Sequence, residues 1–421
     1  MLLAILFLLC GAVYTAATFM LVWTSAKLGS PLFYTIVGVT LSVYVIVLTA
    51  VWNRRPAPRA LLLLAFLLAG AVRVPLLLPN VGTDNDMMRY VWDGRVQRMG
   101  YNPYHVLPAD PALAYTHNDE TRSMPSARAR TPYPPAAQLF FRLVVTIHDS
   151  SRAMKLALVL CDLLTMLVVW RWLAVTGRNE WLALAYGWSP FVVLEVAHSG
   201  HIDALGALWI AACAYFLARR RTTLASIVFV AAVATKLLPI VLAPLLWKRV
   251  RLRDAAIGGA LFALFYLPFV WGPGLPVGAM PSVVAGIRFN GPIFEAISAI
   301  TFPPVAAAVA VLVGLGVAWW ARWTRDVANP AAWAWPMAAA LLSAPVIYPW
   351  YLLYLTPFLV SVSTFPILVW SFTILLTYLV WFVPEYRLPW VVPAWVLAVE
   401  YGMVITAGLS VWLWRRKPPA P

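Results

Sequence analysis

The chain begins with an uncharged apolar run, LLAILFLLCGAVYTAATFMLV, at positions 2–22. Similar runs recur to the end of the sequence, and about 20 apolar residues at about 1.5 Å each span the hydrocarbon core of a bilayer. A cleaved signal has an apolar region of only about 7 to 15 residues, so we expect the first run to remain as an anchor. The repetition predicts an all-α polytopic membrane protein with roughly 12–14 transmembrane segments, some of them short broken hairpins.

The composition supports this class. Of 421 residues, 62% are hydrophobic and 11% are charged, whereas soluble domains have about 25% charged residues. The net charge of +15 does not indicate a nucleic-acid partner, because the basic residues cluster at the ends of apolar runs, where they set membrane orientation. Cys10, Cys161 and Cys213 all fall inside predicted spans, so they offer neither a disulfide framework nor zinc-ligand spacing.

Basic clusters indicate how the chain is oriented. They lie at 54–59, 219–221, 248–253 and 415–417. The positive-inside rule makes these ends cytoplasmic, which places both termini inside and the polar segment 81–150 outside. The expected parts are three N-terminal transmembrane helices (1–80), an extracytoplasmic loop with interfacial helices (81–151) and a transmembrane bundle that completes an active-site cavity (152–421).

Two segments are too short for two full crossings. Both flanks of residues 222–247 are basic, yet about 26 residues cannot cross a bilayer twice. We expect a short hairpin that turns near Lys236. A second hairpin is expected within 325–364, where APVIYPWY at 344–351 supplies two prolines. Broken helices at membrane depth usually line a cavity.

The polar segment is entered through TDNDMMRYVWDGR at 83–95. A helix from Asp86 would form two stripes, Asp86, Tyr90, Asp93 and Gln97 on one side and Met88, Trp92, Val96 and Met99 on the other. This pattern predicts an interfacial helix with its aromatic side in lipid. The alternative is a solvated loop whose aspartates only cap helices.

Other polar residues are expected at the same membrane face. His198-x-x-His201-x-Asp203 follows an apolar run and suits metal ligation, hydrogen bonds to a substrate or a helix cap. Lys236 would be costly in hydrocarbon unless it meets an anion or snorkels to the interface. Asp162 and Glu195 are weaker candidates, since each could simply pair with a neighbouring helix.

A sugar transfer from a lipid-linked donor fits these features. No Gly-rich phosphate loop follows a strand, and no region outside the spans could hold a nucleotide-binding domain. A polyprenyl-phosphate sugar avoids both requirements. A carboxylate would take the proton of an acceptor hydroxyl, and Lys236, Arg89 or Arg288 would stabilise the leaving phosphate.

Several motifs together carry a resemblance. They are DxxRYxWDGR at 86–95, GxNPY at 100–104, YPP at 133–135, GHxD at 200–203, KxxP at 236–239 and YPWY at 348–351. Their order and spacing resemble the bacterial polyprenyl-phosphate-mannose-dependent mannosyltransferases of the GT-C glycosyltransferase fold, similar to glycosyltransferase family 87. The resemblance spans roughly residues 84–357.

The resemblance implies an inverting mannosyltransferase of the bacterial plasma membrane with its active site outside. Its catalytic base would be Asp86, or Asp84 as the close alternative. Candidate substrate-binding residues are Arg89, Tyr90, Trp92, Asp93, Arg95, Asn102, Tyr133, His198, His201, Asp203, Lys236, Arg288, Asn290, Tyr348 and Trp350. The partners would be the lipid donor, a lipid or glycan acceptor and membrane lipids. No cofactor is expected, and a divalent cation at Asp84 and Asp86 is not favoured.

Two other functions remain open on the sequence. A glycan ligase or polymerase also acts on lipid-linked sugars but does not need an acidic base. A transporter or flippase would use Lys236, Asp162, Glu195 and the histidines as an ion relay. The residues do not select between mannose, glucose, galactose and arabinose.

Overall fold

The computed structural model describes residues 1–78, 85–272, 275–388 and 390–416. These residues form helices and no β-strand, apart from one isolated bridge between Phe289 and Val346. The predicted all-α polytopic membrane architecture is confirmed.

Eight helical segments within the described residues are long and apolar enough to cross a bilayer. They are α1 (Leu2–Trp23), α2 (Pro31–Val51), α3 with η1 (Arg59–Ala71 and Val74–Leu77), α6 (Ser151–Val175), α12 with η6 (Leu252–Tyr266 and Leu267–Phe269), α15 (Pro303–Thr324), the run η9, α17, η10 and α18 (Val362–Thr364, Phe365–Thr373, Ile374–Tyr378 and Leu379–Phe382) and α20 (Ala394–Arg416). Several of the roughly 12–14 expected segments are therefore shorter than a full crossing.

The remaining helices are short. They are α4 (Asn85–Arg98), η2 (Pro111–Thr116), α5 (Pro135–Ile147), η3 (Glu180–Leu182), α7 (Ala183–Gly187), α8 (Pro190–Val192), η4 (Val193–His198), α9 (Asp203–Ala218), α10 (Thr222–Thr235), η5 (Leu238–Leu242), α11 (Ala243–Leu246), α13 (Met280–Gly286), α14 (Pro292–Ile300), α16 (Pro330–Leu342), η7 (Pro349–Tyr354), η8 (Thr356–Phe358) and α19 (Pro384–Arg387).

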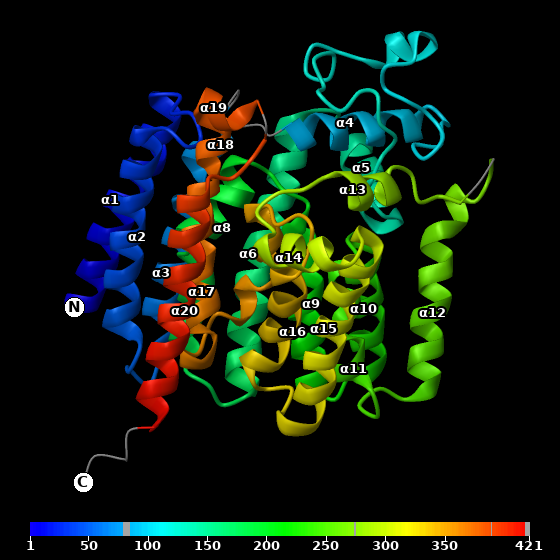
Figure 1. Ribbon diagram of the computed structural model, residues 1–421. Helices are drawn as coiled ribbons and strands as arrows, with labels where there is room; N and C mark the ends of the chain where they lie inside the picture. The colour runs from blue at the N-terminus through cyan, green and yellow to red at the C-terminus, as the bar shows by residue number, and fades with distance from the viewer. Residues whose placement is uncertain (79–84, 273–274, 389, 417–421) are drawn as a thin grey trace.

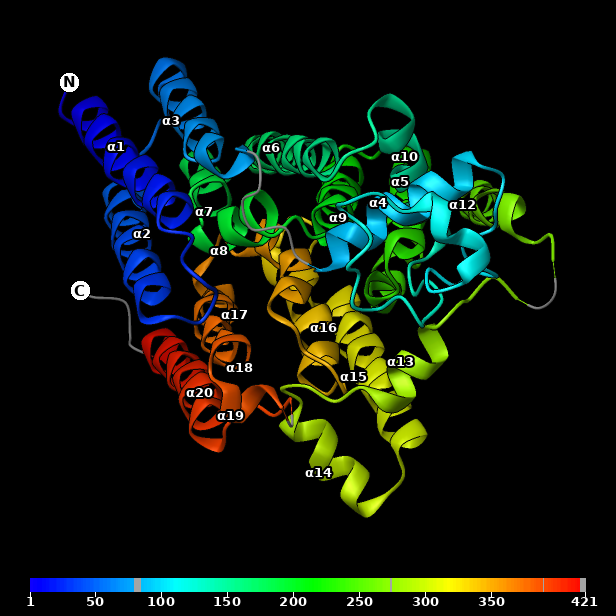
Figure 2. The ribbon, with the colours of Figure 1, turned by 90° about the horizontal axis from the view of Figure 1, so that it is seen from above.

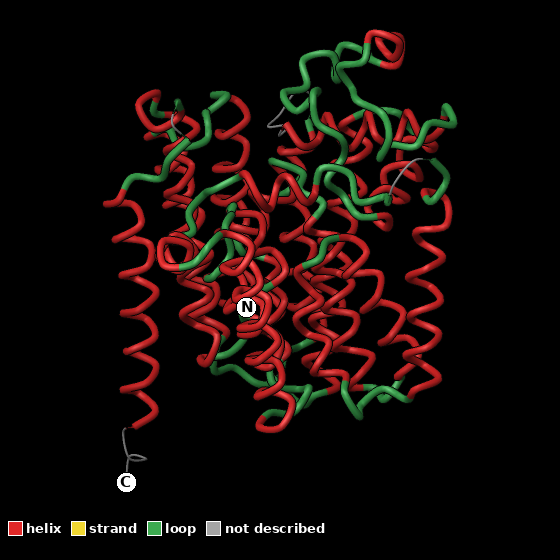
Figure 3. Tube along the Cα trace, turned by 45° about the vertical axis from the view of Figure 1, so that its right-hand side comes forward, coloured by secondary structure: helices red, strands yellow, loops and turns green. Residues whose placement is uncertain are grey.

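The helices stand side by side, and the polar segment lies across one end of them. In Figure 1 this segment, with α4, is at the top, whereas the end of α20 and the α11–α12 and α15–α16 connections are at the bottom. Seen from above in Figure 2, α1, α2, α17 and α20 lie on one side of the molecule and α9, α10, α12 and α15 on the other. Figure 3 shows that loops are concentrated at the two ends of the bundle.

Both expected hairpins are present. Helix α10 ends at Thr235, Lys236 has extended backbone angles (φ −160°, ψ 146°), and the chain returns through η5 and α11. The second break separates α16 from η7, where Phe289 N donates to Pro345 O at 3.0 Å and Ile347 N donates to Phe289 O at 2.9 Å. The backbone of the second turn is therefore hydrogen-bonded to another segment of the protein.

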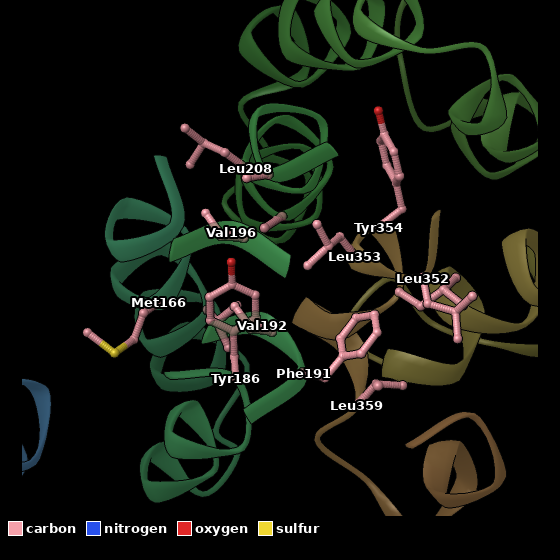
Figure 4. Close-up of a cluster of buried hydrophobic side chains, with 14 of the residues drawn as sticks. Met166, Tyr186, Phe191, Val192, Val196, Leu208, Leu352, Leu353, Tyr354 and Leu359 are labelled. Carbon is pink, nitrogen blue, oxygen red and sulfur yellow. The ribbon is translucent and has the colours of Figure 1, made fainter. Parts of the chain in front are cut away.

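The interior of the bundle is a tightly packed apolar cluster. Figure 4 shows Phe191 of α8 and Val196 of η4 beside Leu353 and Tyr354 of η7. In lipid there is little hydrophobic driving force between helices, so close van der Waals packing holds such a core. Gly206 of α9 fits this picture, because a Cβ there would overlap the Tyr354 ring.

A buried ion pair fixes the end of the third span. The Arg73 guanidinium binds both carboxylate oxygens of Asp162, with Nε to Oδ2 at 2.5 Å, and donates to Gly187 O at 2.9 Å. Both side chains are almost fully buried. Asp162 is thus paired with a neighbouring helix, which was the structural alternative for this residue.

Helix α4 does not place its aromatic side in lipid, so that expectation was wrong. Trp92 and Val96 are completely buried and pack against Leu113 and Met124. The Trp92 Nε1 donates to Thr116 Oγ1 at 2.9 Å. The physical reason is that the chain after α4 folds back over this face and covers it with its own apolar side chains.

Candidate active site

Asp86 lies in the first turn of α4. The Tyr133 hydroxyl donates a hydrogen bond to its carboxylate, and the Lys236 and Arg89 cations act on it electrostatically. Burial nevertheless raises the pKa of Asp86 above its ordinary value, because desolvation outweighs these stabilising groups. Burial and the Asp86 charge also raise the pKa of Tyr133, which keeps its hydroxyl protonated as a donor. Asp84 lies outside the described residues.

Lys236 is held by a carboxylate and an aromatic ring. Its Nζ is 2.7 Å from Asp203 Oδ1 and 2.9 Å from Asp203 Oδ2, and it lies 4.0 Å from the centre of the Tyr351 ring. The Asp203 side chain is fully buried, whereas that of Lys236 is 23% exposed. The ammonium is therefore held by a charge-assisted contact and by the face of an aromatic ring.

Close packing brings Asp86 and Asp203 together. The segment that enters α9 contains Gly200 with φ +81°, and a Cβ there would overlap the terminal methyl of Met87 in α4. The Ile202 backbone N–H also donates to the Tyr90 hydroxyl oxygen, with the two heavy atoms 3.4 Å apart. The first turn of α4 consequently rests on the start of α9, and the Asp86 and Asp203 carboxyl groups interact electrostatically.

His201 forms one end of a stack of rings. Its ring is parallel to Trp350, with centres 4.1 Å apart, and Trp350 stacks in turn on Tyr348 at 4.6 Å. His201 Nε2 is 3.3 Å from Glu195 Oε2, and the Tyr378 hydroxyl donates to Glu195 at 2.9 Å. Glu195 thus lies beside the imidazole, and the Lys236 cation acts on His201 electrostatically.

The two histidines do not converge on one point. His198 Nδ1 lies 3.2 Å from Ser199 Oγ, whereas His201 faces Glu195. In the part of the chain that the structure describes, no three His, Cys, Asp or Glu side chains are grouped so as to hold a metal ion.

Several of the predicted substrate-binding residues form bonds within the polar segment that contains α4. Arg89 Nε binds Asp93 Oδ1 at 2.7 Å, and Arg89 Nη1 donates to a backbone carbonyl at 2.7 Å. Arg95 forms a two-point ion pair with Asp149, with both distances 2.8 Å. Together with the buried Trp92, these side chains hold the loop above the bundle, and only Arg89 is also close enough to act on Asp86.

Three further predicted residues contact other parts of the molecule. Asn102 Nδ2 donates to Phe269 O at 2.9 Å, which joins the outer loop to the end of α12 and η6. The Arg288 guanidinium lies over the Phe294 ring at 4.7 Å. Asn290 Nδ2 donates to Glu400 Oε1 of α20 at 3.1 Å. The structure therefore gathers Asp86, Tyr133, His201, Asp203, Lys236 and Trp350 but bonds these three residues elsewhere.

The sequence interpretation missed two residues of this region. Tyr351, which caps the Lys236 ammonium, lies inside the YPWY motif but was not singled out. Lys155, in the first turn of α6, is only 3% exposed and acts electrostatically on His198. Its signal in the sequence is the one that revealed Lys236, a cation within an apolar run.

The fold and this site, together with a comparison to known families, define a class. The protein is a polytopic membrane glycosyltransferase. Its helical bundle carries a carboxyl group and an anchored ammonium at one end. A protein-family model described as "Alpha-(1->6)-mannopyranosyltransferase, N-terminal domain" matches residues 2–250. The match covers more than half of the chain, and the protein belongs to this family. No curated protein and no solved structure shows a significant match.

Proposed function

We propose that the protein transfers a mannosyl residue from a polyprenyl-phosphate donor to a lipid or glycan acceptor. The site would face the outside of a bacterial plasma membrane. The observation that carries the proposal is the close arrangement of Asp86, Lys236 and Asp203 at one end of the bundle. It supplies a base for the acceptor and a cation for the donor phosphate within one site.

In the proposed reaction the Asp86 carboxylate removes the proton of the acceptor hydroxyl. The acceptor oxygen attacks the anomeric carbon, and the bond between this carbon and the phosphate oxygen breaks. The bonding electrons go to the phosphate oxygen, whose growing negative charge Lys236 stabilises. Attack opposite the leaving group inverts the anomeric centre. The mechanism uses no metal ion, since Lys236 provides the positive charge.

The surroundings of Asp86 favour its role as a base. Its raised pKa gives the carboxylate a greater affinity for the acceptor proton than an exposed aspartate has. Lys236, Tyr133 and Arg89 each act against the effect of burial, because they stabilise the ionised carboxylate. Asp203 would act as a positioning residue that keeps the Lys236 ammonium where the phosphate oxygen leaves.

The sidedness of the site follows from charge. The α11–α12 connection, which carries Lys248, Arg249, Arg251 and Arg253, lies at the end of the bundle opposite α4 (Figure 1). Basic connections remain in the cytoplasm. We therefore place α4 and Asp86 on the extracytoplasmic side, where lipid-linked sugars are the available donors.

The proposal is tested with purified protein in detergent, polyprenyl-phosphate mannose and an acceptor lipid extract. Asp86→Asn is expected to lower the rate of mannose transfer by about 100-fold to 10,000-fold, the usual contribution of a general base. Asp110→Asn is a matched control in the same outer loop, because Asp110 only caps η2 through a bond to Ala112 N. Asp84→Asn tests whether the alternative base, Asp84, is needed for transfer.

The outcomes separate the remaining functions. Normal transfer by Asp86→Asn, with loss in Asp84→Asn, would move the role of base to Asp84. Normal transfer by both variants would support a glycan ligase or polymerase that needs no acidic base. Transfer in detergent, where no ion gradient exists, is not expected of a transporter.

A further inference from the structure

A dense basic surface lies at the end of the bundle away from Asp86. We call it the basic rim, and it consists of Arg219, Arg220, Arg221, Lys248, Arg249, Arg251, Arg253, Arg322 and Arg325. These residues come from three places in the chain, namely the α9–α10 turn, the α11–α12 connection and the end of α15. Figure 1 shows the last two at the bottom of the bundle.

Specific bonds bring the three places together. The Thr222 and Thr223 hydroxyls donate to Asp254 at 2.6 and 2.7 Å, which joins the start of α10 to the start of α12. Arg249 Nη2 donates to Arg325 O at 2.8 Å, and Arg322 Nε donates to Trp247 O at 2.6 Å. The cations are therefore held close to one another by the fold, rather than scattered along flexible loops.

The protein balances only part of the positive charge of the basic rim, through Asp254 and Asp326. Asp254 is engaged by two threonines and lies 3.7 Å from Arg253, while Asp326 caps the turn after α15 through Ala328 N. No ion pair in the described residues involves the other cations of the rim. Burial is the main cause that lowers the pKa of Arg249; the neighbouring Arg322 cation also lowers it, and Asp326 raises it.

Tryptophans place the basic rim at the depth of lipid headgroups. Trp247, Trp320 and Trp323 are each more than half exposed, and exposed tryptophans of membrane proteins concentrate at the interface between hydrocarbon and water. The Arg322 guanidinium lies 5.1 Å from the Trp323 ring centre and that of Arg325 lies 4.9 Å from the Trp320 ring centre. The guanidinium groups thus sit where phosphodiester groups of the bilayer lie.

We propose that the basic rim is a binding site for the headgroup of an anionic phospholipid. A phosphodiester accepts two parallel hydrogen bonds from a guanidinium, and a second cation beside it adds electrostatic attraction. The apolar tails of the lipid would lie along the exposed tryptophans. The site is independent of the proposed sugar transfer, because it lies at the other end of the bundle and shares no residue with the site around Asp86.

Lys248, Arg251 and Arg325 are suited to a test, since their side chains make no hydrogen bond or ion pair in the described structure. The full-length protein is placed in nanodiscs of phosphatidylcholine with increasing fractions of phosphatidylglycerol, and thermal unfolding is followed. The triple variant Lys248→Gln, Arg251→Gln, Arg325→Gln is compared with wild type. Each cation near an anionic bilayer contributes about fivefold in affinity, so the phosphatidylglycerol fraction for half-maximal stabilisation should rise on the order of 100-fold or pass beyond reach.

A matched control removes the same charge elsewhere on the same end. Arg54→Gln, Arg55→Gln, Arg59→Gln changes the α2–α3 connection and the first residue of α3, none of which is part of the basic rim. This variant should keep the wild-type response to phosphatidylglycerol. An equal loss of response in both triple variants would overturn the proposal, because it would indicate general attraction of charge to the bilayer.

Two further outcomes would also refute the site. One is an unchanged melting temperature of the wild type when phosphatidylglycerol is added. The other is equal stabilisation by sodium phosphate in pure phosphatidylcholine, which would point to a free anion instead of a lipid. If the triple variant does not fold, Arg325→Gln alone should weaken the response about fivefold. Native mass spectrometry of retained phosphatidylglycerol provides an independent readout.

Discussion

Asp203→Asn tests whether the Lys236 ammonium must be anchored for transfer. Asp203 is fully buried and contacts Nζ at 2.7 and 2.9 Å. Asparagine keeps one acceptor oxygen but loses the charge, so one charge-assisted hydrogen bond of about 2 kcal/mol is removed. If this energy holds the ammonium at the leaving phosphate, kcat should fall about 30-fold. Because the Asp203 side chain is fully buried, thermal unfolding of the variant is measured alongside kcat to establish that the protein still folds.

The assay is steady-state transfer of mannose from polyprenyl-phosphate mannose by purified enzyme. A matched control is Asp254→Asn, which makes the same change at another buried aspartate, bonded only to threonines and Arg253 at the far end of the bundle. This control should retain kcat within about twofold. A wild-type kcat in Asp203→Asn, with thermal unfolding unchanged, would refute the anchoring role and leave Lys236 without a defined position in the mechanism.

Two other predictions concern the surroundings of Asp86. Lys236→Met should raise the pKa of Asp86 further, because the substitution removes a cation that lowers this pKa. The low-pH limb of the kcat/KM profile, where Asp86 becomes protonated, should therefore move to higher pH. An unchanged limb in the pH profile of the variant would argue that another group is the base. Gly94→Ala should destabilise the outer loop by about 1–3 kcal/mol, since a Cβ would lie 2.6 Å from Phe141 O and 2.8 Å from Val145 Cγ2. A wild-type melting temperature for Gly94→Ala would show that α4 and α5 can separate without cost.

The breaks in the bundle were predictable from the sequence because their physical cost is local. A charged lysine within an apolar run is costly in hydrocarbon whatever the rest of the fold is. The sequence therefore predicted a break at Lys236, and helix α10 ends at the residue before it. Prolines near 345–349 could be assigned to the second turn for the same reason. These features depend on neighbours in the sequence and on the thickness of a bilayer, not on distant contacts.

The partners of the polar side chains were not predictable, because they depend on distant segments. The apolar stripe that includes Trp92 suits lipid and protein equally, and only the fold of the following chain shows that Leu113 and Met124 cover it. Asn290 was expected in the site, but it bonds Glu400, which lies 110 residues away in the sequence. Hydrophobic periodicity carries no information about which distant segment satisfies a polar group.

Helix α20 follows all other described helices in the sequence, and only 17% of its membrane-length segment is buried in the bundle. Its Glu400 is nevertheless fully buried and accepts bonds from Asn290 and Trp370. The backbone next to Asn290 is bridged to residues 345–347, just before the Trp350 ring. During synthesis on the ribosome, the bonds of Glu400 to Asn290 and Trp370 can form only after α20 has been made. A nascent chain stalled before Glu400 would carry Asp86 and Lys236 but would lack these bonds.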